Sequence, residues 1–184
     1  MHLNALPQGM DSAKTMTQTD GNNLWERFQR YYTEFPSIGL GLDISRMNFT
    51  EEFIGQIKPR LAKALPGLQF IHLTGTVSVE PVRQAYDALG LSAVVRPFLT
   101  EMEYALGAAD LALSRSGASS LAEFSAMELP AILIPYPTAV DDHQRLNARS
   151  FVDIGAARCF HQKQLTSNLL VSQLSELFGS PAKL

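Results

Sequence analysis

The chain has 184 residues, of which 46% are hydrophobic, and this suits a single domain with a sizeable core. The net charge of −3, without any run of Lys or Arg, argues against a nucleic-acid-binding surface. The single cysteine, Cys159, excludes an internal disulfide and suits a reducing compartment, and we expect it to be a buried, inert thiol.

Neither a membrane span nor a secretory leader is expected. The longest apolar stretch, residues 129–136, is far shorter than the about 20 residues that a membrane-spanning helix needs. The N-terminus has no basic region followed by an apolar one. The sequence therefore predicts a cytoplasmic protein, and peripheral contact with the cytoplasmic face of the membrane stays open.

The first 36 residues differ from the rest of the chain. Residues 1–23 are polar and irregular, which predicts a mobile tail, and residues 24–35 suit a short helix with aromatic side chains on one side. Arg27 and Arg30 lie among those aromatic residues, but a helix that docks on a partner explains them as well as nucleic acid does. We therefore divide the chain into a tail with a candidate docking helix, 1–36, and one domain, 37–184.

Beyond Pro36, apolar runs that suit strands alternate with amphipathic patterns that suit helices. The predicted strands span residues 37–42, 68–73, 93–95, 111–113, 131–134 and 156–160. The predicted helices span residues 49–65, 80–89, 101–108, about 119–127, 141–154 and 166–177. Such alternation, in units of about 20–30 residues, predicts an α/β fold: a single Rossmann-like domain of about six parallel strands with flanking helices.

Several single residues carry expectations of their own. His72 lies in an apolar strand, so we expect a core histidine with its hydrogen bonds satisfied. Phe98 and Leu99 follow the third strand and are compatible with a place in the core. Thr100 is the predicted cap of the helix over 101–108, with Glu103 completing a capping box.

The polar turn at residues 115–120 carries the most chemistry. Gly117 removes side-chain bulk where a ligand can approach the backbone, and Ser119 or Ser120 is the predicted N-cap of the next helix. The free amides and positive end of a helix N-terminus favour an anion such as phosphate. Glu123, one turn further on the side of Ser119, suits a sugar diol. The pattern indicates a nucleotide diphosphate with its ribose.

Two simpler readings remain beside this one. Small-residue turns before helices are common in α/β proteins, and most bind nothing, while an acidic residue early in a helix often only complements the helix dipole. Asp141, Asp142 and His143 form a weak metal motif, because adjacent residues cannot all point at one ion. We therefore predict no metal.

Seven separated matches, in the correct order, relate the second half of the chain to a known family. They are Ala109-Asp110, Arg115-Ser116-Gly117-Ala118, Glu123, Leu129-Pro130-Ala131, Pro135, His143-Gln144 and Asn147-Ala148. Over residues 68–177 the chain resembles the donor-binding half of the MurG-type transferases, which are glycosyltransferases of family 28 with the two-domain GT-B fold. The resemblance implies that the domain at 37–184 is the C-terminal half of such an enzyme.

The resemblance also implies an activity. The family are inverting hexosyltransferases that transfer GlcNAc from UDP-GlcNAc to a lipid-linked muramyl-pentapeptide, which converts lipid I to lipid II in peptidoglycan synthesis. The sugar is displaced directly from UDP, whose growing charge the helix-tip amides stabilise, so no cofactor or metal is implied beyond the donor substrate. The acceptor site and catalytic base belong to an N-terminal domain that has no counterpart in this sequence, so we name no catalytic residue and expect no activity without an acceptor domain or subunit.

The donor-binding residues follow from the family motifs. Leu99 corresponds to a position that contacts uracil through its backbone, and Gln144 to one that contacts the donor sugar, with Asn147 supporting the same rim. The full implied set is Leu99, Arg115, Ser116, Gly117, Ala118, Ser119, Ser120, Leu121, Ala122, Glu123, Gln144 and Asn147. The chain departs from the family at residues 42–46, Leu-Asp-Ile-Ser-Arg, where the family has a Gly-rich loop near the donor phosphates.

Two alternatives stay open, and the departure at residues 42–46 favours the second of them. The chain is then either a standalone donor subunit of a split lipid-pyrophosphate GlcNAc transferase, with the segment 24–35 docking on its acceptor subunit, or a non-catalytic nucleotide-sugar-binding protein. Asp43, in the altered loop, would oppose a bound diphosphate.

Overall fold

The computed structural model describes residues 39–43, 57, 60, 61, 63–65, 67–75, 79–139 and 142–180, with residues 39–43 described by their backbone. The predicted tail, the candidate docking helix and the loop at 44–46 lie outside the described residues, so the predictions made for them stay predictions. The same holds for the proposed division into 1–36 and 37–184.

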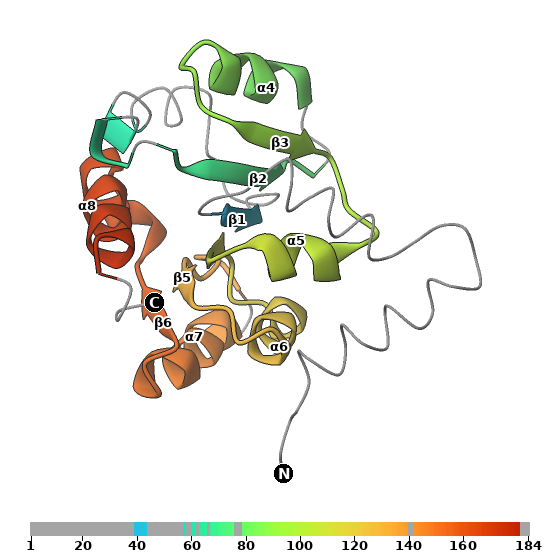
Figure 1. The fold of residues 1–184 in the computed structure, drawn as a ribbon. Helices are drawn as coiled ribbons and strands as arrows, with labels where there is room; N and C mark the ends of the chain where they lie inside the picture. Colours follow the sequence, from blue (N-terminus) through green and yellow to red (C-terminus); the bar gives the residue numbers. More distant parts are fainter. Residues whose placement is uncertain are drawn as a thin grey trace, which may run out of the picture.

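The strands form one parallel sheet, as the sequence predicts (Figure 1). Its order is β3-β2-β1-β4-β5-β6, with every neighbouring pair parallel. The strands are β1 Gly39–Asp43, β2 Gln69–Leu73, β3 Ala93–Arg96, β4 Leu111–Ser114, β5 Ala131–Leu133 and β6 Ala157–Cys159. The order runs outward from β1 in both directions, so the chain reverses its direction of winding between β1 and β4, which is where open α/β sheets bind ligands.

Helices cover both faces of this sheet. They are α4 Val79–Asp87, α5 Met102–Ala108, α6 Ala118–Ala126, α7 His143–Asp153 and α8 Ser167–Phe178, with a short 3₁₀ helix, η2, at Gln162–Gln164. In Figure 1, α8 lies on one side of the sheet and α5 and α6 lie on the other. This arrangement confirms the predicted α/β fold with flanking helices.

Strand alternation explains the two layers. In β4, Leu111 and Leu113 join the core cluster that contains residues of α4 and α8, while Ala112 between them joins the cluster that contains residues of α5, α6 and α7. In β5, Ile132 joins the first cluster and Ala131 and Leu133 join the second. Because successive side chains point to opposite faces, a strand covered on both sides is apolar on both, and only Ser114, the buried last residue of β4, departs from this in the two strands.

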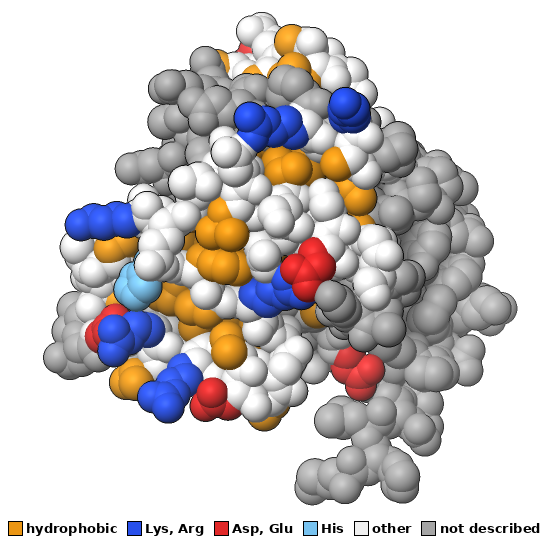
Figure 2. All heavy atoms as spheres, turned by 90° about the vertical axis from the view of Figure 1, so that its left-hand side faces the viewer, with side chains coloured by type: hydrophobic (Ala, Val, Ile, Leu, Met, Phe, Trp, Pro, Cys, Tyr) orange, Lys and Arg blue, Asp and Glu red, His pale blue; other side chains and the backbone are white. Residues whose placement is uncertain are grey.

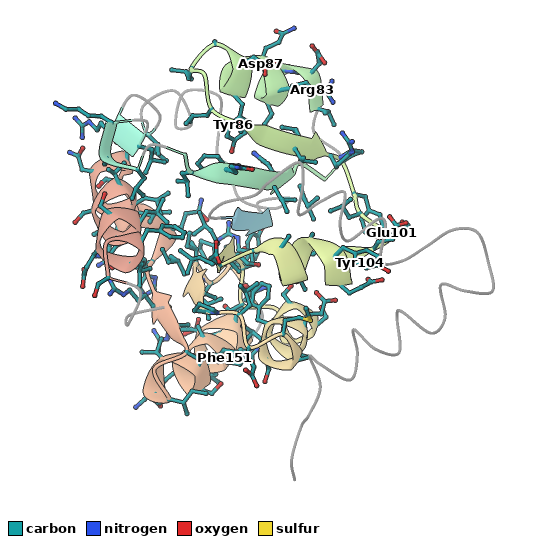
Figure 3. The ribbon with its side chains drawn as sticks, viewed as in Figure 1. Arg83, Tyr86, Asp87, Glu101, Tyr104 and Phe151 are labelled. Carbon is teal, nitrogen blue, oxygen red and sulfur yellow. The ribbon has the colours of Figure 1, made fainter. Side chains whose placement is uncertain are left out.

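His72 and Tyr86 form a satisfied pair in the core, as predicted for His72. His72 is 2% exposed, and its Nδ1 lies 3.2 Å from the Tyr86 hydroxyl. Figure 3 shows Tyr86 pointing from α4 toward the sheet. Burial raises the pKa of Tyr86 far above its ordinary value, so the phenol stays neutral.

Two predicted side-chain positions are wrong. Cys159 is exposed, because β6 is the edge strand and its last residue faces solvent. Desolvation nevertheless raises the pKa of its thiol above the ordinary value, so the group stays protonated at neutral pH. Phe98 is 72% exposed, whereas Leu99 beside it is 6% exposed and packs against β2 and α5.

The helix caps follow sequence only in part. Thr166 caps α8 by accepting a hydrogen bond from the Leu169 N–H at 3.2 Å. Thr100 does not cap α5: that helix has Glu101 as its N-cap, without a side-chain cap bond, so the predicted box with Glu103 does not form. The Thr100 hydroxyl donates instead to the Glu101 carboxylate at 3.4 Å.

Surface charges are largely paired along α7, β6 and α8. Arg158 of β6 reaches both carboxylate oxygens of Glu176 on α8, at 3.0 and 3.1 Å, and Arg149 pairs with Asp153 one turn further along α7. Figure 2 shows acidic side chains next to several basic ones on this face. No described helix combines the length and the apolar character that crossing a membrane requires.

Candidate functional site

The candidate site lies where β4 and β5 end. Three residues, Arg115–Gly117, connect the end of β4 to the start of α6, and a longer loop connects β5 to α7. Both connections leave the carboxyl ends of neighbouring parallel strands, so they meet at the same edge of the sheet. The first of them also adjoins the reversal between β1 and β4.

The amino end of α6 is open. Its N-cap is Gly117, with no side-chain cap bond, so the prediction that Ser119 or Ser120 caps the helix is wrong. Both serines lie inside the first helical turn, because α6 begins at Ala118. A Cβ built on Gly117 would meet no atom within 4 Å, so there is open space over this residue. The first helical amides have no partner within their own helix and suit an anion.

Glu123, the residue predicted to bind the ribose, also faces solvent. Glu123 and Ser119 are both exposed and four residues apart, so they lie on one face of α6. Ala122 is exposed as well, while Leu121 is 4% exposed and packs in the core. Leu121 can therefore meet a ligand only through its backbone, whose N–H already donates to the Gly117 carbonyl at 3.0 Å.

Arg115 turns into the protein. The residue is 8% exposed, and its Nη1 donates to the carbonyls of Ile134 and Pro135 at 3.0 and 3.2 Å. Its Nη2 donates to Gln162 Oε1 at 2.8 Å, and the guanidinium carbon lies 5.3 Å from the centre of the Tyr136 ring. Desolvation lowers the pKa of this guanidinium from its ordinary value. Its charged hydrogen bonds to the Ile134 and Pro135 carbonyls hold the β5–α7 loop in place.

A second set of bonds ties α7 to the turn before α6. The Ser116 hydroxyl donates to the Gln144 carbonyl at 2.7 Å, and Asn147 Nδ2 donates to the Ser116 carbonyl at 3.1 Å. Gln144 Oε1 accepts the Tyr136 N–H at 2.8 Å. This bond fixes the amide so that its NH₂ group faces away from the Tyr136 backbone. Ser116, Gln144 and Asn147 are thus brought together from positions 28 to 31 residues apart.

Leu99 lies apart from this group. It follows β3, the edge strand, and two strands, β2 and β1, separate β3 from β4. Its side chain packs with Ile71, Leu73 and Ala105. Leu99 therefore shares the carboxyl-terminal edge of the sheet with the other predicted residues but makes no described contact with them.

Two residues of the site were missed by sequence reasoning. Tyr136 supplies the N–H that orients Gln144 and the ring beside Arg115, and Gln162 supplies the third acceptor of that guanidinium. The segment Pro-Tyr-Pro, one residue after β5, was a usable signal for Tyr136. Gln162 lies 47 residues from Arg115, and nothing in its sequence neighbourhood points to the pairing.

The weak metal motif has other contacts. Asp142 is the N-cap of α7 with a left-handed φ of 55°, and its carboxylate lies 2.9 Å from Arg145 Nε. Asp141 lies outside the described residues. Within the described part of the chain, no three His, Cys, Asp or Glu residues are grouped so that they could hold a metal ion.

Comparison with known proteins gives consistent matches. The protein-family model described as the glycosyltransferase family 28 C-terminal domain matches residues 47–184. A UDP-N-acetylglucosamine–N-acetylmuramyl-(pentapeptide) pyrophosphoryl-undecaprenol N-acetylglucosamine transferase of Myxococcus xanthus is 40% identical over 135 residues, which cover 70% of this chain and 35% of that protein. The protein of the same name from Hahella chejuensis is 41% identical over 134 residues, which cover 71% of this chain and 37% of that protein.

The solved structures agree with the sequence comparison. The crystal structure of Acinetobacter baumannii MurG superposes with a TM-score of 0.67 at 28% identity, over 84% of this chain and 46% of that one. The chain thus spans about a third of the length of the curated relatives named above.

Proposed function

Because this chain belongs to the family of glycosyltransferase family 28 C-terminal domains, we propose that it is the donor-binding half of a GlcNAc transferase and that it binds UDP-GlcNAc. The observation that carries the proposal is the open amino end of α6, joined by Ser116 to Gln144 at the edge of the sheet. That edge adjoins the strand-order reversal between β1 and β4.

The diphosphate binds at the amino end of α6. The amides from Ala118 onward and the helix dipole favour a negative charge there, and no side-chain cap occupies them. Gly117 leaves space for phosphate oxygens to approach. The ribose hydroxyls then lie near the exposed carboxylate of Glu123, and the uracil near the backbone of Leu99.

The sugar binds at the start of α7. Gln144 Oε1 is held by the Tyr136 N–H, so the amide nitrogen is the atom left to meet a sugar hydroxyl. Arg115 and Asn147 act as positioning residues, because their side chains hold the loop and the turn that carry the ligand-facing groups.

The proposed reaction is transfer of GlcNAc to a lipid-linked muramyl-pentapeptide, the activity that the names of the relatives print. We propose that it proceeds with inversion at the anomeric carbon. The helix-tip amides stabilise the departing UDP, whose negative charge grows as the bond to the anomeric carbon breaks. The donor substrate is the only small molecule that the proposal requires. The acceptor and the catalytic base come from an acceptor domain or subunit, and the enzyme works at the cytoplasmic face of the membrane.

Calorimetric titration of the chain with UDP and UDP-GlcNAc tests the proposal. Glu123→Ala should weaken UDP binding by about 1–3 kcal/mol, because a hydrogen bond to the ribose is lost. Glu80→Ala is the matched control: Glu80 is also an exposed helical glutamate, but it lies on α4 and bonds to Arg83 and Gln84. If the two variants bound UDP with equal affinity, the assignment of Glu123 to the ribose would be wrong. If the wild-type chain did not bind UDP, the proposed function would be wrong. Binding without turnover when an acceptor domain is supplied would favour a non-catalytic binder.

A further inference from the structure

Residues 135–137, just after β5, form one wall of a pocket at the carboxyl ends of β5 and β6. The pocket has a volume of about 370 Å³, within the range of about 300–1,000 Å³ that small-molecule sites occupy. Its other walls are the start of α7, with Asp142 and Arg145, and the segment 161–164 after β6. None of these lining residues belongs to the predicted donor-binding set, so the pocket is a separate cavity beside the donor site.

One wall of the pocket is apolar and aromatic. Tyr136 is 44% exposed and has a proline on either side in the sequence. The Arg115 guanidinium carbon lies 5.3 Å from the centre of the tyrosine ring, and this cation–π contact holds the ring in place. A ring that is already held offers a flat surface on which another ring can stack. This wall therefore favours a ligand with a flat apolar body.

The rest of the lining is polar and carries one uncompensated positive charge. Arg145 and Asp142 pair at 2.9 Å and offset one another. Lys163 is exposed and forms no ion pair with any residue that the structure describes. Gln162 accepts a hydrogen bond from Arg115 through Oε1, so its amide nitrogen remains as a donor. An ammonium group and an amide N–H group together suit one carboxylate.

The two kinds of wall together define the ligand class. A bare anion would leave the tyrosine wall unused, and a neutral aromatic compound would leave the Lys163 charge without a partner. A nucleoside diphosphate brings several negative charges, whereas the pocket offers one ammonium group beside the imidazole of His161. An aromatic ring that carries a single carboxylate satisfies both walls.

Two hydrogen bonds join the pocket to the candidate donor site. Arg115 donates to Gln162 Oε1 at 2.8 Å, and the Tyr136 N–H donates to Gln144 Oε1, also at 2.8 Å. The first bond connects the pocket to the turn before α6, and the second orients the amide that we propose to meet the donor sugar. A ligand that holds Tyr136 and Gln162 in place therefore also holds the loop that orients Gln144.

We propose that this pocket is a second ligand site, that it binds a small aromatic carboxylate, and that its occupancy raises the affinity of the chain for UDP-GlcNAc. The aromatic ring stacks on Tyr136, and the carboxylate pairs with Lys163 and accepts from the Gln162 amide. The effect on the donor rests on the proposed function, because it acts through Gln144. Since Gln144 meets only the sugar, the affinity for UDP stays unchanged. Coupling between two sites is reciprocal, so UDP-GlcNAc raises the affinity for the carboxylate by the same factor.

Amide NMR titrations of the full chain with phenylacetate, before any nucleotide is added, test the site by itself. Phenylacetamide keeps the ring without the charge, cyclohexylacetate keeps the charge without a flat ring, and acetate has no ring. Phenylacetate should shift the amides of Tyr136, Gln162 and Lys163 and bind more tightly than each of the three comparison compounds. The proposal is wrong if these amides do not shift, or if any comparison compound binds as tightly as phenylacetate.

Matched variants assign the contacts. Lys163→Gln should weaken phenylacetate binding about threefold to fivefold, as expected for an exposed ion pair, and leave phenylacetamide binding unchanged. Lys63→Gln, at another exposed lysine far from the pocket in the sequence, should change neither affinity. Tyr136→Leu should weaken binding of both compounds, because it removes the ring but keeps the backbone N–H that bonds to Gln144. Wild-type affinity for phenylacetate in Lys163→Gln or Tyr136→Leu would overturn the proposal.

Calorimetric titration with UDP-GlcNAc, with and without saturating phenylacetate, measures the coupling. We expect the affinity for UDP-GlcNAc to rise about fivefold, at the lower end of couplings between sites, and the affinity for UDP to stay the same. No rise, or an equal rise for both nucleotides, would refute the coupling through Gln144. Displacement of phenylacetate by UDP would mean that the compound occupies the donor site, and the second site would be wrong. A chain that binds phenylacetate in the pocket but binds neither nucleotide would refute the donor-site function and leave the second site standing.

Discussion

Arg115→Met separates a positioning role for this residue from a direct contact with the donor. Methionine keeps most of the apolar stem and removes the guanidinium, so three hydrogen bonds are lost, two to the carbonyls of Ile134 and Pro135 and one to Gln162. A hydrogen bond to a charged group contributes about 1.5–3 kcal/mol. Removing a buried charge returns part of this loss, because the charge no longer has to be desolvated. We expect the free energy of unfolding to fall by about 2–4 kcal/mol.

Urea unfolding followed by far-ultraviolet circular dichroism measures this loss. Arg149→Met is the matched control: Arg149 is exposed on α7 and pairs with Asp153 at 3.7 Å, so its loss should cost less than about 1 kcal/mol. Calorimetry on the folded fraction then measures UDP affinity. If Arg115→Met unfolds like the control yet no longer binds UDP, the guanidinium contacts the ligand and the positioning role is wrong.

Two further predictions concern regions outside the site. Thr166→Ala should lower the free energy of unfolding by about 1 kcal/mol, because the Leu169 N–H at the start of α8 loses its side-chain acceptor, whereas Ser172→Ala in the middle of the same helix should not destabilise the chain. Urea unfolding measures the stability of both variants. If they were equally stable, Thr166 would not contribute as an N-cap. Cys159 should react with iodoacetamide more slowly in the folded chain than in urea at the same pH, and its rate should rise at a higher pH, since the raised pKa leaves less thiolate. If the reaction rate rose over the same pH range in the folded and the unfolded chain, the raised pKa of Cys159 would be wrong.

The Cys159 shift has a consequence for stability as well. A thiol whose pKa is higher in the folded state than in the unfolded state binds its proton more tightly when folded. The contribution of this thiol to the free energy of unfolding is therefore complete below its pKa in the unfolded chain, and it is lost as the pH rises through its pKa in the folded chain. Stability should fall in that alkaline range in the wild type and less so in Cys159→Ser.

The site combines ligand-facing groups with a scaffold that is hidden from the ligand. Ser119 and Glu123 lie exposed on α6, while Ser116 is fully buried and joins the turn to α7. A substitution at Ser116 or Asn147 should therefore affect affinity through the relative placement of the two helices. Substitutions at Glu123 should act on the ligand alone.

Local sequence determined most of the fold. Apolar runs at β4 and β5, each bounded by a polar turn, are enough to place strands that are buried on both faces, and the alternation with amphipathic helices requires a parallel sheet. The turn at residues 115–120 was recognisable for the same reason: small residues between a buried strand and a helix leave backbone amides accessible. These features depend on neighbours within one or two turns of the chain.

Tertiary structure alone decided how the site is assembled. The family motifs place Arg115 among the donor-binding residues, but its guanidinium donates to the carbonyls of Ile134 and Pro135, just after β5, and to Gln162. The exposure of Cys159 likewise depends on β6 being the last strand of the sheet. The periodicity of the sequence determines which face of a helix or strand a residue occupies. The atoms that the residue contacts there belong to segments tens of residues away. Only the packing of those segments decides whether a polar group bonds to the protein or remains available to a ligand.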